Sequence, residues 1–561
     1  MGSARAQDWR FKPDRSASGA LQRVPARGAL TRGARFAKIR ATRLTHSTPP
    51  VINMEWTLST DVVVIGAGAA GLAAAVSARD HGAAVILVEE NYDIGGHAML
   101  SGGRVQLGGG NALQKRFGVE DSPDQVFEDW VNFKRGDSRF NDRDLVRVFA
   151  DECVPTFQFL LDNGVTFIEK PISTPDASTA PRVFVTHEWH IASEVIAPRR
   201  NRNGSGLVRR LAESARKKGV QIFVKHKMTR IVREQPNNGK AIGIVAKADG
   251  RDIAIEAKKG VIIATGGHTG NVNFRRMFDP RLTEEYQQAG MPYSVQGADG
   301  ELAAMDIGAS LWATGAQTTD DGRAITKTRH IGCRWGYASL YYEPDSPIFH
   351  LCKATGLTVP DWQEVILVKQ NGKRFWNELD DSHAFLHAAL AYDGDTAKPN
   401  GGGPIWAIFD AEAVARQNWK PEPPHVDPDG YFFKADTVFE LAGKIRNPHQ
   451  KRPMDGAALQ ETVNRYNAFV AAGVDADFGK PTPLFKIEKP PFYAAWSTPI
   501  LHDTLTGLRT DTAAQVIDTR GETIPGLYCA GESQGGFAQH GLGRSLVFGR
   551  IAGRHAAQRN S

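Results

Sequence analysis

The sequence predicts a protein of the α/β class, with strands and helices alternating around a mainly parallel sheet. The first observation is the stretch VVVIGAGAAGLAAAVSARDHGAAVILVEE, residues 62–90, where a β-branched run leads into a glycine-rich turn and an alanine-rich helix. The second is the apolar run Ala84–Val88, which predicts a second strand after that helix. The third is that the alternation stops between Gln317 and Pro499, where prolines and aromatic residues become frequent. These features predict a Rossmann-like domain interrupted by a region of different architecture.

The glycine-rich turn has the spacing of a dinucleotide site. Gly66 permits the tight turn, Gly68 lets a pyrophosphate approach the backbone, and Gly71 lets helix and strand pack closely. The helix N-terminus presents free N–H groups to phosphate. Glu89 ends the second strand, where an acidic side chain accepts both hydroxyls of an adenosine ribose. A glycine-rich turn that binds nothing is the alternative, which the strand, the helix and Glu89 together disfavour. The turn alone fits NAD and FAD equally.

Length and charge describe an ordinary globular chain with a basic tail. The 561 residues predict two or three domains, and the formal net charge is +6. Residues 1–53 hold nine Arg and two Lys against Asp8 and Asp14, a net of +9, so the remainder carries −3. Neither a nucleic-acid groove nor a membrane patch is therefore expected on the folded body. Elsewhere we expect helices over 145–163 and 206–218, and strands over 221–225 and 241–246.

The tail and the cysteines bear on where the protein resides. The tail lacks the apolar core and cleavage site of a secretory signal, and we expect it to be disordered, with Met54 as the natural start. No apolar run long enough to cross a membrane appears. The cysteines are irregularly spaced and predict no disulfide framework or metal site, which favours a reducing, cytoplasmic location. They are Cys153, Cys333, Cys352 and Cys529.

Further stretches identify the dinucleotide through a resemblance. The second strand is followed by GGHAMLSGG, residues 95–103, and later by six more stretches in order: GVIIATGGHTGN, GADGELAAMDIGA, VKQNGKRFWNE, KADTVFELAGKI, PILHDTLTGLRTD and IPGLYCAGESQGG. Together they resemble the FAD-dependent fumarate reductase/succinate dehydrogenase flavoprotein family, over essentially all of the chain after Met54. The resemblance implies FAD, and an α/β fold in which a split, Rossmann-like FAD-binding domain carries an inserted α+β capping domain. The expected divisions are 1–53 (tail), 54–315 and 501–561 (FAD-binding domain) and 316–500 (cap).

The resemblance also implies which residues hold the cofactor. The amides of Gly541 and Leu542 are expected at the N-terminus of the last helix, facing the pyrimidine end of the flavin, and Glu532 is expected beside the ribityl chain. Asp299 follows Ala298 where the family has glycine. We expect FAD to be held without a covalent bond, because His97 falls one position from the histidine that succinate dehydrogenases link to flavin. The full expected set is Gly66, Gly68, Ala70, Gly71, Glu89, Gly96, Ala98, Ser101, Gly102, Gly103, Met228, Thr265, Gly266, Asp299, Glu532, Gly541 and Leu542.

Three catalytic candidates lie on the substrate side of the resemblance. His502 occupies the position where the family has a histidine beside the substrate. His540 precedes the flavin-contacting amides, and a helix-capping role is its alternative. Tyr341 belongs to an aromatic set in the cap, CRWGYASLYYEP, that suits a ring or a conjugated carbonyl compound, with core packing as the alternative. A tyrosine or histidine base and hydride exchange with flavin N5 would fit.

The substrate side departs from the family pattern at three places. Ser382 stands where fumarate-reducing members have a proton-donating arginine, the loop GGFAQH lacks their carboxylate-binding arginine, and Gln317 is not followed by their histidine and proline. We therefore expect an FAD-dependent oxidoreductase acting on a C–C bond next to a carbonyl-type group of a small molecule that is not a simple dicarboxylate. The alternatives are a fumarate reductase-like reductase of an unsaturated acid and a non-catalytic, redox-sensing flavoprotein. The electron partner is left open.

Overall fold

The computed structural model of the protein describes most of the chain after the basic tail. The described residues are 55–132, 141–168, 179–189, 203–288, 290, 294–312, 325–334, 354–380, 383–391, 402–450, 452–539 and 541–560. The expected disordered tail, the proposed start at Met54 and the aromatic set of the cap lie outside these ranges. Among the described residues, no helix is both long enough and apolar enough to cross a membrane.

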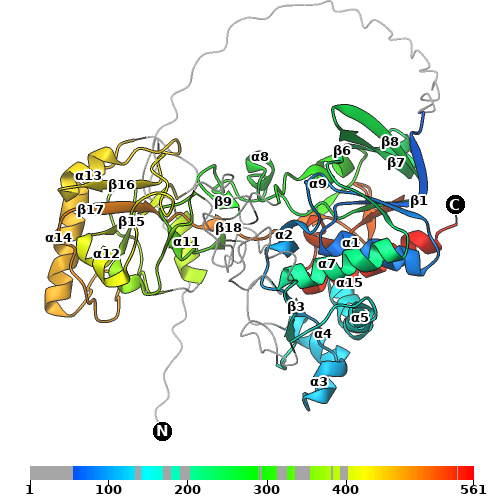
Figure 1. The fold of residues 1–561 in the computed structure, drawn as a ribbon, viewed down its shortest axis with the longest axis horizontal. Helices are drawn as coiled ribbons and strands as arrows, with labels where there is room; N and C mark the ends of the chain where they lie inside the picture. The colour runs from blue at the N-terminus through cyan, green and yellow to red at the C-terminus, as the bar shows by residue number, and fades with distance from the viewer. Residues whose placement is uncertain are drawn as a thin grey trace, which may run out of the picture. The chain divides into compact units, whose positions relative to one another are not determined.

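An eight-stranded sheet forms the centre of the Rossmann-like part (Figure 1). Its main path runs β20-β21-β8-β1-β2-β5, and the neighbours β21-β8, β8-β1, β1-β2 and β2-β5 are all parallel. The long strands β6, β7 and β8 extend one part of it as an antiparallel meander. The bounds are Leu58–Ile65 (β1), Val85–Val88 (β2), Gln221–Phe223 (β5), Lys227–Gln235 (β6), Asn238–Ala248 (β7), Arg251–Ile263 (β8), Gln515–Ile517 (β20) and Thr523–Cys529 (β21).

Strand β1 is buried on both faces, as its unbroken apolar run predicts. Val62 and Val64 join a core formed with helices on one face, whereas Val63 and Ile65 join a second core, shared with β6, β7 and β8, on the other. Successive side chains of a strand point to opposite faces, so a strand with no polar face needs both covered. The predicted parallel βαβ unit is therefore confirmed.

Helix α1 (Ala69–Asp80) is held against the C-terminal helix α15 (Leu542–Gln558) by small residues. A Cβ on Gly549 would lie 2.3 Å from the carbonyl oxygen of Ala70, and one on Gly553 would lie 2.2 Å from that of Ala74. Only glycine permits this approach. The first helix of the fold is thus paired with the last, side by side in Figure 1.

The other helices of this part are α5 and α7, together with shorter elements. Helix α5 begins after Asp142, whose carboxylate accepts the N–H groups of Asp144 and Leu145, and α7 packs beside α1. Their bounds and those of the shorter helices and strands are Gly96–Met99 (α2), Arg104–Gln106 (β3), Ala112–Arg116 (α3), Pro123–Val131 (α4), Arg143–Asp162 (α5), Val183–Val185 (β4), Gly204–Lys217 (α7), Val272–Arg275 (α8), Gln287–Gln288 (β9), Asp299–Met305 (α9), Leu311–Trp312 (β10), Ile500–Leu501 (β18), Gly507–Leu508 (β19) and Gly531–Ser533 (η4).

A separate antiparallel sheet, ordered β14-β15-β17-β16, lies in the region expected to be the cap. Alternate residues of β15 enter two cores: Ile405 and Phe409 pack with α11 and α12, and Trp406 and Ile408 with α13 and α14. This gives the α+β architecture expected for the inserted region, while the exact domain boundaries remain a prediction. The bounds are Ile325–Thr326 (β11), His330–Ile331 (β12), Leu357–Thr358 (β13), Trp362–Glu364 (η3), Ile366–Lys369 (β14), His383–Leu390 (α11), Ile405–Phe409 (β15), Ala411–Gln417 (α12), Phe432–Ala435 (β16), Val438–Lys444 (α13), Gly456–Ala472 (α14) and Phe492–Trp496 (β17).

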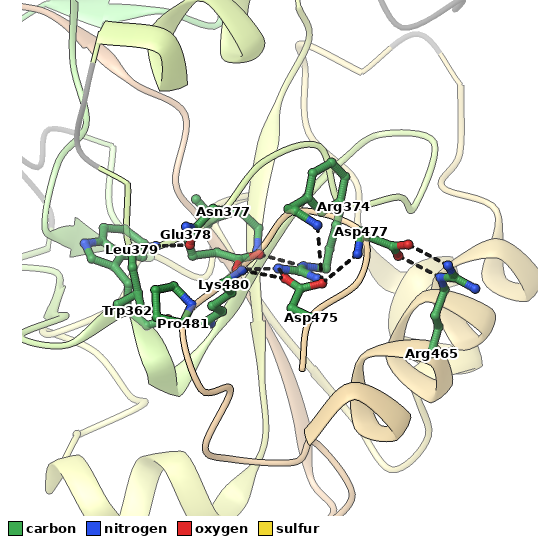
Figure 2. A network of polar contacts seen from close by, with 12 residues as sticks. Trp362, Arg374, Asn377, Glu378, Leu379, Arg465, Asp475, Asp477, Lys480 and Pro481 are labelled. Carbon is green, nitrogen blue, oxygen red and sulfur yellow. Dashed lines mark hydrogen bonds and ion pairs between the residues drawn. The ribbon is translucent and has the colours of Figure 1, made fainter. Parts of the chain in front are cut away.

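A buried charge network joins the NGKRFWNE stretch to the segment after α14 (Figure 2). Arg374 donates to both oxygens of Glu378 at 2.8 Å and to Asp475 at 2.9 Å, and Nζ of Lys480 lies 3.3 Å from Glu378. Two cations thus face two anions, and all four side chains are almost entirely buried. Burial raises the pKa of Glu378, but Lys480 and Arg374 outweigh it and hold that pKa below its usual value. The charges of this stretch therefore stabilise the inserted region internally.

Candidate functional site

One cavity of about 1160 Å³ opens where the strand ends of the parallel sheet meet the N-termini of α1 and α15. Its volume exceeds the roughly 300–1,000 Å³ of sites for drug-sized ligands, which leaves room for a dinucleotide and a small molecule together. Most of the residues predicted from the sequence line it. They are Gly66, Gly68, Ala70, Glu89, Gly96, Ala98, Ser101, Gly102, Met228, Thr265, Gly266, Asp299, Glu532, Gly541, Leu542 and His502.

Four predicted residues are not among the described lining. A Cβ on Gly71 would lie 1.8 Å from the carbonyl oxygen of Gly66, so this glycine serves helix–strand packing, as its position in the motif predicts. Gly103 has a positive φ of 64°, and a Cβ there would lie 2.4 Å from Oγ1 of Thr186. His540 and Tyr341 lie outside the described residues, so their roles remain predictions.

Two helix N-termini point their free N–H groups at the cavity. Gly68 is the N-cap of α1 and Gly541 that of α15, and neither helix has a side-chain cap or an acidic residue in its first turn. An uncapped N-terminus leaves backbone N–H groups to be satisfied by something else, and its partial positive charge favours an anion. Both ends therefore suit the negatively charged parts of a dinucleotide.

Two glycines of the cavity wall indicate whether a ligand can approach the backbone there. Neither Gly68 nor Gly102 has the positive φ that favours glycine, and a Cβ would meet nothing closer than 3.9 Å at Gly68 and nothing within 4 Å at Gly102. Neither backbone conformation nor protein neighbours thus require glycine at these positions. The space that their missing side chains leave faces the cavity, where a ligand needs to approach the backbone. The residues present therefore fit a bound dinucleotide.

Glu89, the residue expected to bind the ribose, is held on the cavity wall by two backbone N–H groups. Its two carboxylate oxygens accept the N–H of Ala67 at 2.7 Å and the N–H of Asn91 at 2.9 Å. Burial raises the pKa of Glu89, and these two hydrogen bonds partly offset the effect. Each oxygen keeps a further lone pair for a hydroxyl donor. Nearby, Lys227 pairs with Asp299 at 3.1 Å.

Charged side chains converge at the other end of the cavity. Nδ1 of His97 lies 3.3 Å from Oε1 of Glu532, and Nε2 of Gln296 donates to Oε2 of Glu532 at 2.7 Å. Burial raises the pKa of Glu532 to about 7, the charge of Asp503 adds to this, and the hydrogen bond from His97 partly offsets it. Burial lowers the pKa of His97, but Glu532 outweighs burial and leaves that pKa above its usual value. This group of side chains therefore holds a proton near neutral pH.

His502 completes that end of the cavity. It follows β18, which pairs with β9 on one side and β11 on the other, so its position is set by three segments far apart in sequence. The rings of His502 and His97 meet edge to face, with centroids 5.7 Å apart. His502 is thus brought beside the proton-holding group of His97 and Glu532.

Several lining residues were not singled out from the sequence. Asp503 directly follows His502, and Gln296 shortly precedes Asp299. Their positions next to predicted residues are the sequence signal that could have identified them. Arg104 directly follows Gly103 and had the same kind of signal, whereas Arg329 had none. Both line the cavity, which therefore does contain guanidinium groups despite the missing family arginines.

Comparison with known proteins agrees with this geometry. Residues 61–544 match the FAD binding domain family. The fumarate reductase (cytochrome) of Shewanella frigidimarina is 29% identical over 89% of this chain and 77% of that protein. The urocanate reductase of Eggerthella lenta is 28% identical over 89% of this chain and 75% of its own length.

A solved structure extends the comparison. The 3-ketosteroid-delta4-(5alpha)-dehydrogenase from Rhodococcus jostii RHA1, in complex with 4-androstene-3,17-dione, is 26% identical with a TM-score of 0.55, covering 91% of this chain and 100% of that one. The match to the FAD binding domain family spans most of the chain, and the cavity fits the dinucleotide FAD. The chain belongs to the FAD binding domain family, and within it to the FAD-dependent fumarate reductase/succinate dehydrogenase flavoproteins.

Proposed function

We propose that the protein is an FAD-dependent oxidoreductase that acts on a C–C bond next to a carbonyl-type group of a small, unsaturated compound other than a simple dicarboxylate. Relatives named for urocanate and for a ketosteroid support this substrate class. The observation that carries the proposal is that His502 and the N-terminus of α15 lie on the wall of one cavity with the dinucleotide glycines. The electron partner is left open, and a cytoplasmic location remains a proposal.

The protein's own groups have distinct tasks in this reaction. When bound, FAD supplies hydride exchange at flavin N5. The N–H groups of Gly541 and Leu542, at the positive end of α15, stabilise negative charge that develops at the cavity wall. His502 holds the proton that the substrate gains or loses, and His97 and Glu532 keep a further proton beside it. Tyr341 and His540 remain alternative candidates for this proton transfer.

The test is a substrate screen on the FAD-loaded full chain. The flavin is photoreduced without oxygen, and cyclic enones, steroid ketones, unsaturated monoacids and fumarate are added while its absorbance is followed. We expect reoxidation by at least one compound other than fumarate, or reduction of oxidised flavin by a saturated counterpart. Fumarate and succinate are expected to react more slowly by orders of magnitude. Efficient fumarate reduction, or no reaction with any compound, would contradict the proposal.

Two histidine substitutions test whether His502 transfers the proton. Replacing His502 by Ala is expected to lower turnover about 100-fold or more while the flavin-to-protein ratio is unchanged. His555→Ala is the matched control, because His555 lies in α15 and is not among the lining residues of the cavity. Unchanged turnover in His502→Ala would remove His502 from the mechanism.

A further inference from the structure

Arg329 reaches the cavity from the side of the inserted region. It lies between β11 and β12, and its carbonyl oxygen accepts the N–H of Val359 at 2.8 Å, so its backbone is anchored. The residues on either side, Thr328 and His330, are buried, whereas Arg329 itself is exposed to the cavity. The fold therefore fixes this residue in place and leaves its side chain open.

The guanidinium of Arg329 has no hydrogen-bond or ion-pair partner among the described residues. Other cations near the cavity are already engaged: Lys227 pairs with Glu90 at 2.8 Å, and the buried Arg544 donates to the carbonyl oxygens of Phe537 and Thr504. A guanidinium presents a fork of N–H donors that matches a carboxylate and is always charged. Arg329 is therefore an available anion partner.

Acidic side chains line the same cavity as Arg329. Asp503 lines the same cavity as His502, and its negative charge disfavours an anionic group placed beside it. A carboxylate that leaves water without a cation costs several kcal/mol. A negative group on a substrate is therefore better placed beside Arg329 than beside Asp503.

We propose that Arg329 binds one anionic group, of the carboxylate class, on the substrate, and so selects a monoanion. This inference rests on the proposed function and names its substrate class. Arg329 coincides with neither arginine position of the fumarate-reducing pattern, namely Ser382 and the GGFAQH loop. The single guanidinium of Arg329 can pair with one carboxylate, which agrees with a substrate that is not a dicarboxylate. The remainder of the substrate extends towards His502.

Matched acids and amides test the charge alone. Cinnamate, sorbate and cyclohex-1-ene-1-carboxylate, and the primary amide of each, are titrated into the FAD-loaded full chain. Binding is followed by flavin absorbance, with equilibrium dialysis where the colour does not change. We expect at least one acid to bind about 10- to 100-fold more tightly than its amide. Arg329→Gln is expected to reduce this ratio to about 1, and Arg329→Lys to retain part of it.

Arg104→Gln tests the alternative that Arg104 binds the anionic group. Arg104 is the other arginine that lines the cavity and has no side-chain partner among the described residues. It should leave the ratio unchanged. The proposal is overturned if no acid binds more tightly than its amide, if Arg329→Gln keeps the ratio, or if Arg104→Gln alone abolishes it. Turnover of neutral enones without any acid preference would refute this inference and leave the proposed function standing. Acid preference without hydride exchange would refute only the proposed function.

Discussion

Nδ1 of His97 lies 3.3 Å from Oε1 of Glu532, which joins the segment after the second strand of the fold to the segment after its last strand. This contact places an imidazole and a carboxyl group, both with raised pKa, on the wall of the FAD cavity. It also determines how stability should depend on pH.

The expected effect is a loss of stability as the pH rises. The pKa of Glu532 is raised from 4.5 to about 7, so between these values the folded state binds more protons than the unfolded state. Stability then falls with increasing pH, and the raised pKa of His97 acts in the same direction above its usual value. Relative to Glu532→Gln, the apo protein should lose on the order of 1–3 kcal/mol between about pH 5 and pH 8. Parallel curves of Tm against pH for the two proteins would contradict this.

Valine at Gly68 or Gly102 should abolish FAD binding without unfolding the protein. A Cβ there meets no protein atom closer than 3.9 Å, and we expect it to occupy space where the cofactor approaches the backbone. The purified variants are expected to keep the wild-type apo Tm and to lack the flavin spectrum. Gly443→Val is the matched control, because this helix residue also has nothing within 4 Å but is not among the lining residues of the cavity. It should bind FAD stoichiometrically, and FAD retained by Gly68→Val would refute the assignment.

Breaking the cap network should destabilise the protein strongly. Glu378→Gln leaves Lys480 and Arg374 buried without their shared anion, which typically costs about 3–5 kcal/mol. Urea denaturation of the apo protein followed by tryptophan fluorescence measures the change. Arg465→Ala removes the exposed pair with Asp477 nearby and serves as the control, with no measurable change expected. Equal effects of the two substitutions would show that burial does not set the contribution of these charges.

Acid precipitation should release all of the flavin into the supernatant. Nδ1 of His97 is engaged with Glu532, and we expect FAD to be held without a covalent bond. Protein that stays yellow in the pellet would identify a covalent link, and loss of that colour in His97→Ala would place it. Released flavin analysed by chromatography should run as FAD.

The sequence allowed the βαβ unit to be predicted because its signals are local. The run Val62–Ile65 and the glycine spacing belong to one continuous segment, and the structure confirms them. The observed ends of some helices and strands differ from the predicted ends, because a capping side chain or a backbone angle determines where the element begins or stops. Helix α5 begins at Arg143 because Asp142 caps it, and β5 ends at Phe223, shortly before Lys225 turns to a φ of 57°. The cap sheet was not predicted strand by strand, because its strands are short and their pairing is non-local.

Site residues could be predicted from the sequence only where they lie in a recognisable motif. At Ala298, where the family has glycine, the backbone has the left-handed φ of 64° that glycine favours, and Asp299 lines the cavity as expected. Arg329 could not be found in this way. Its contribution depends on segments that meet only after folding, and a lone arginine in a loop has no spacing that signals a site.

The pairing of α1 with α15 has a consequence for biosynthesis. Ser77 donates to the carbonyl oxygen of Arg550 at 2.8 Å, across 473 residues of sequence, and Gly549 and Gly553 seat α15 on α1. A ribosome delivers α1 long before α15. Until α15 has emerged, the nascent chain carries an incomplete nucleotide cradle, and the face of α1 that packs on α15 is uncovered. We therefore expect FAD to bind stably only after α15 has been synthesised.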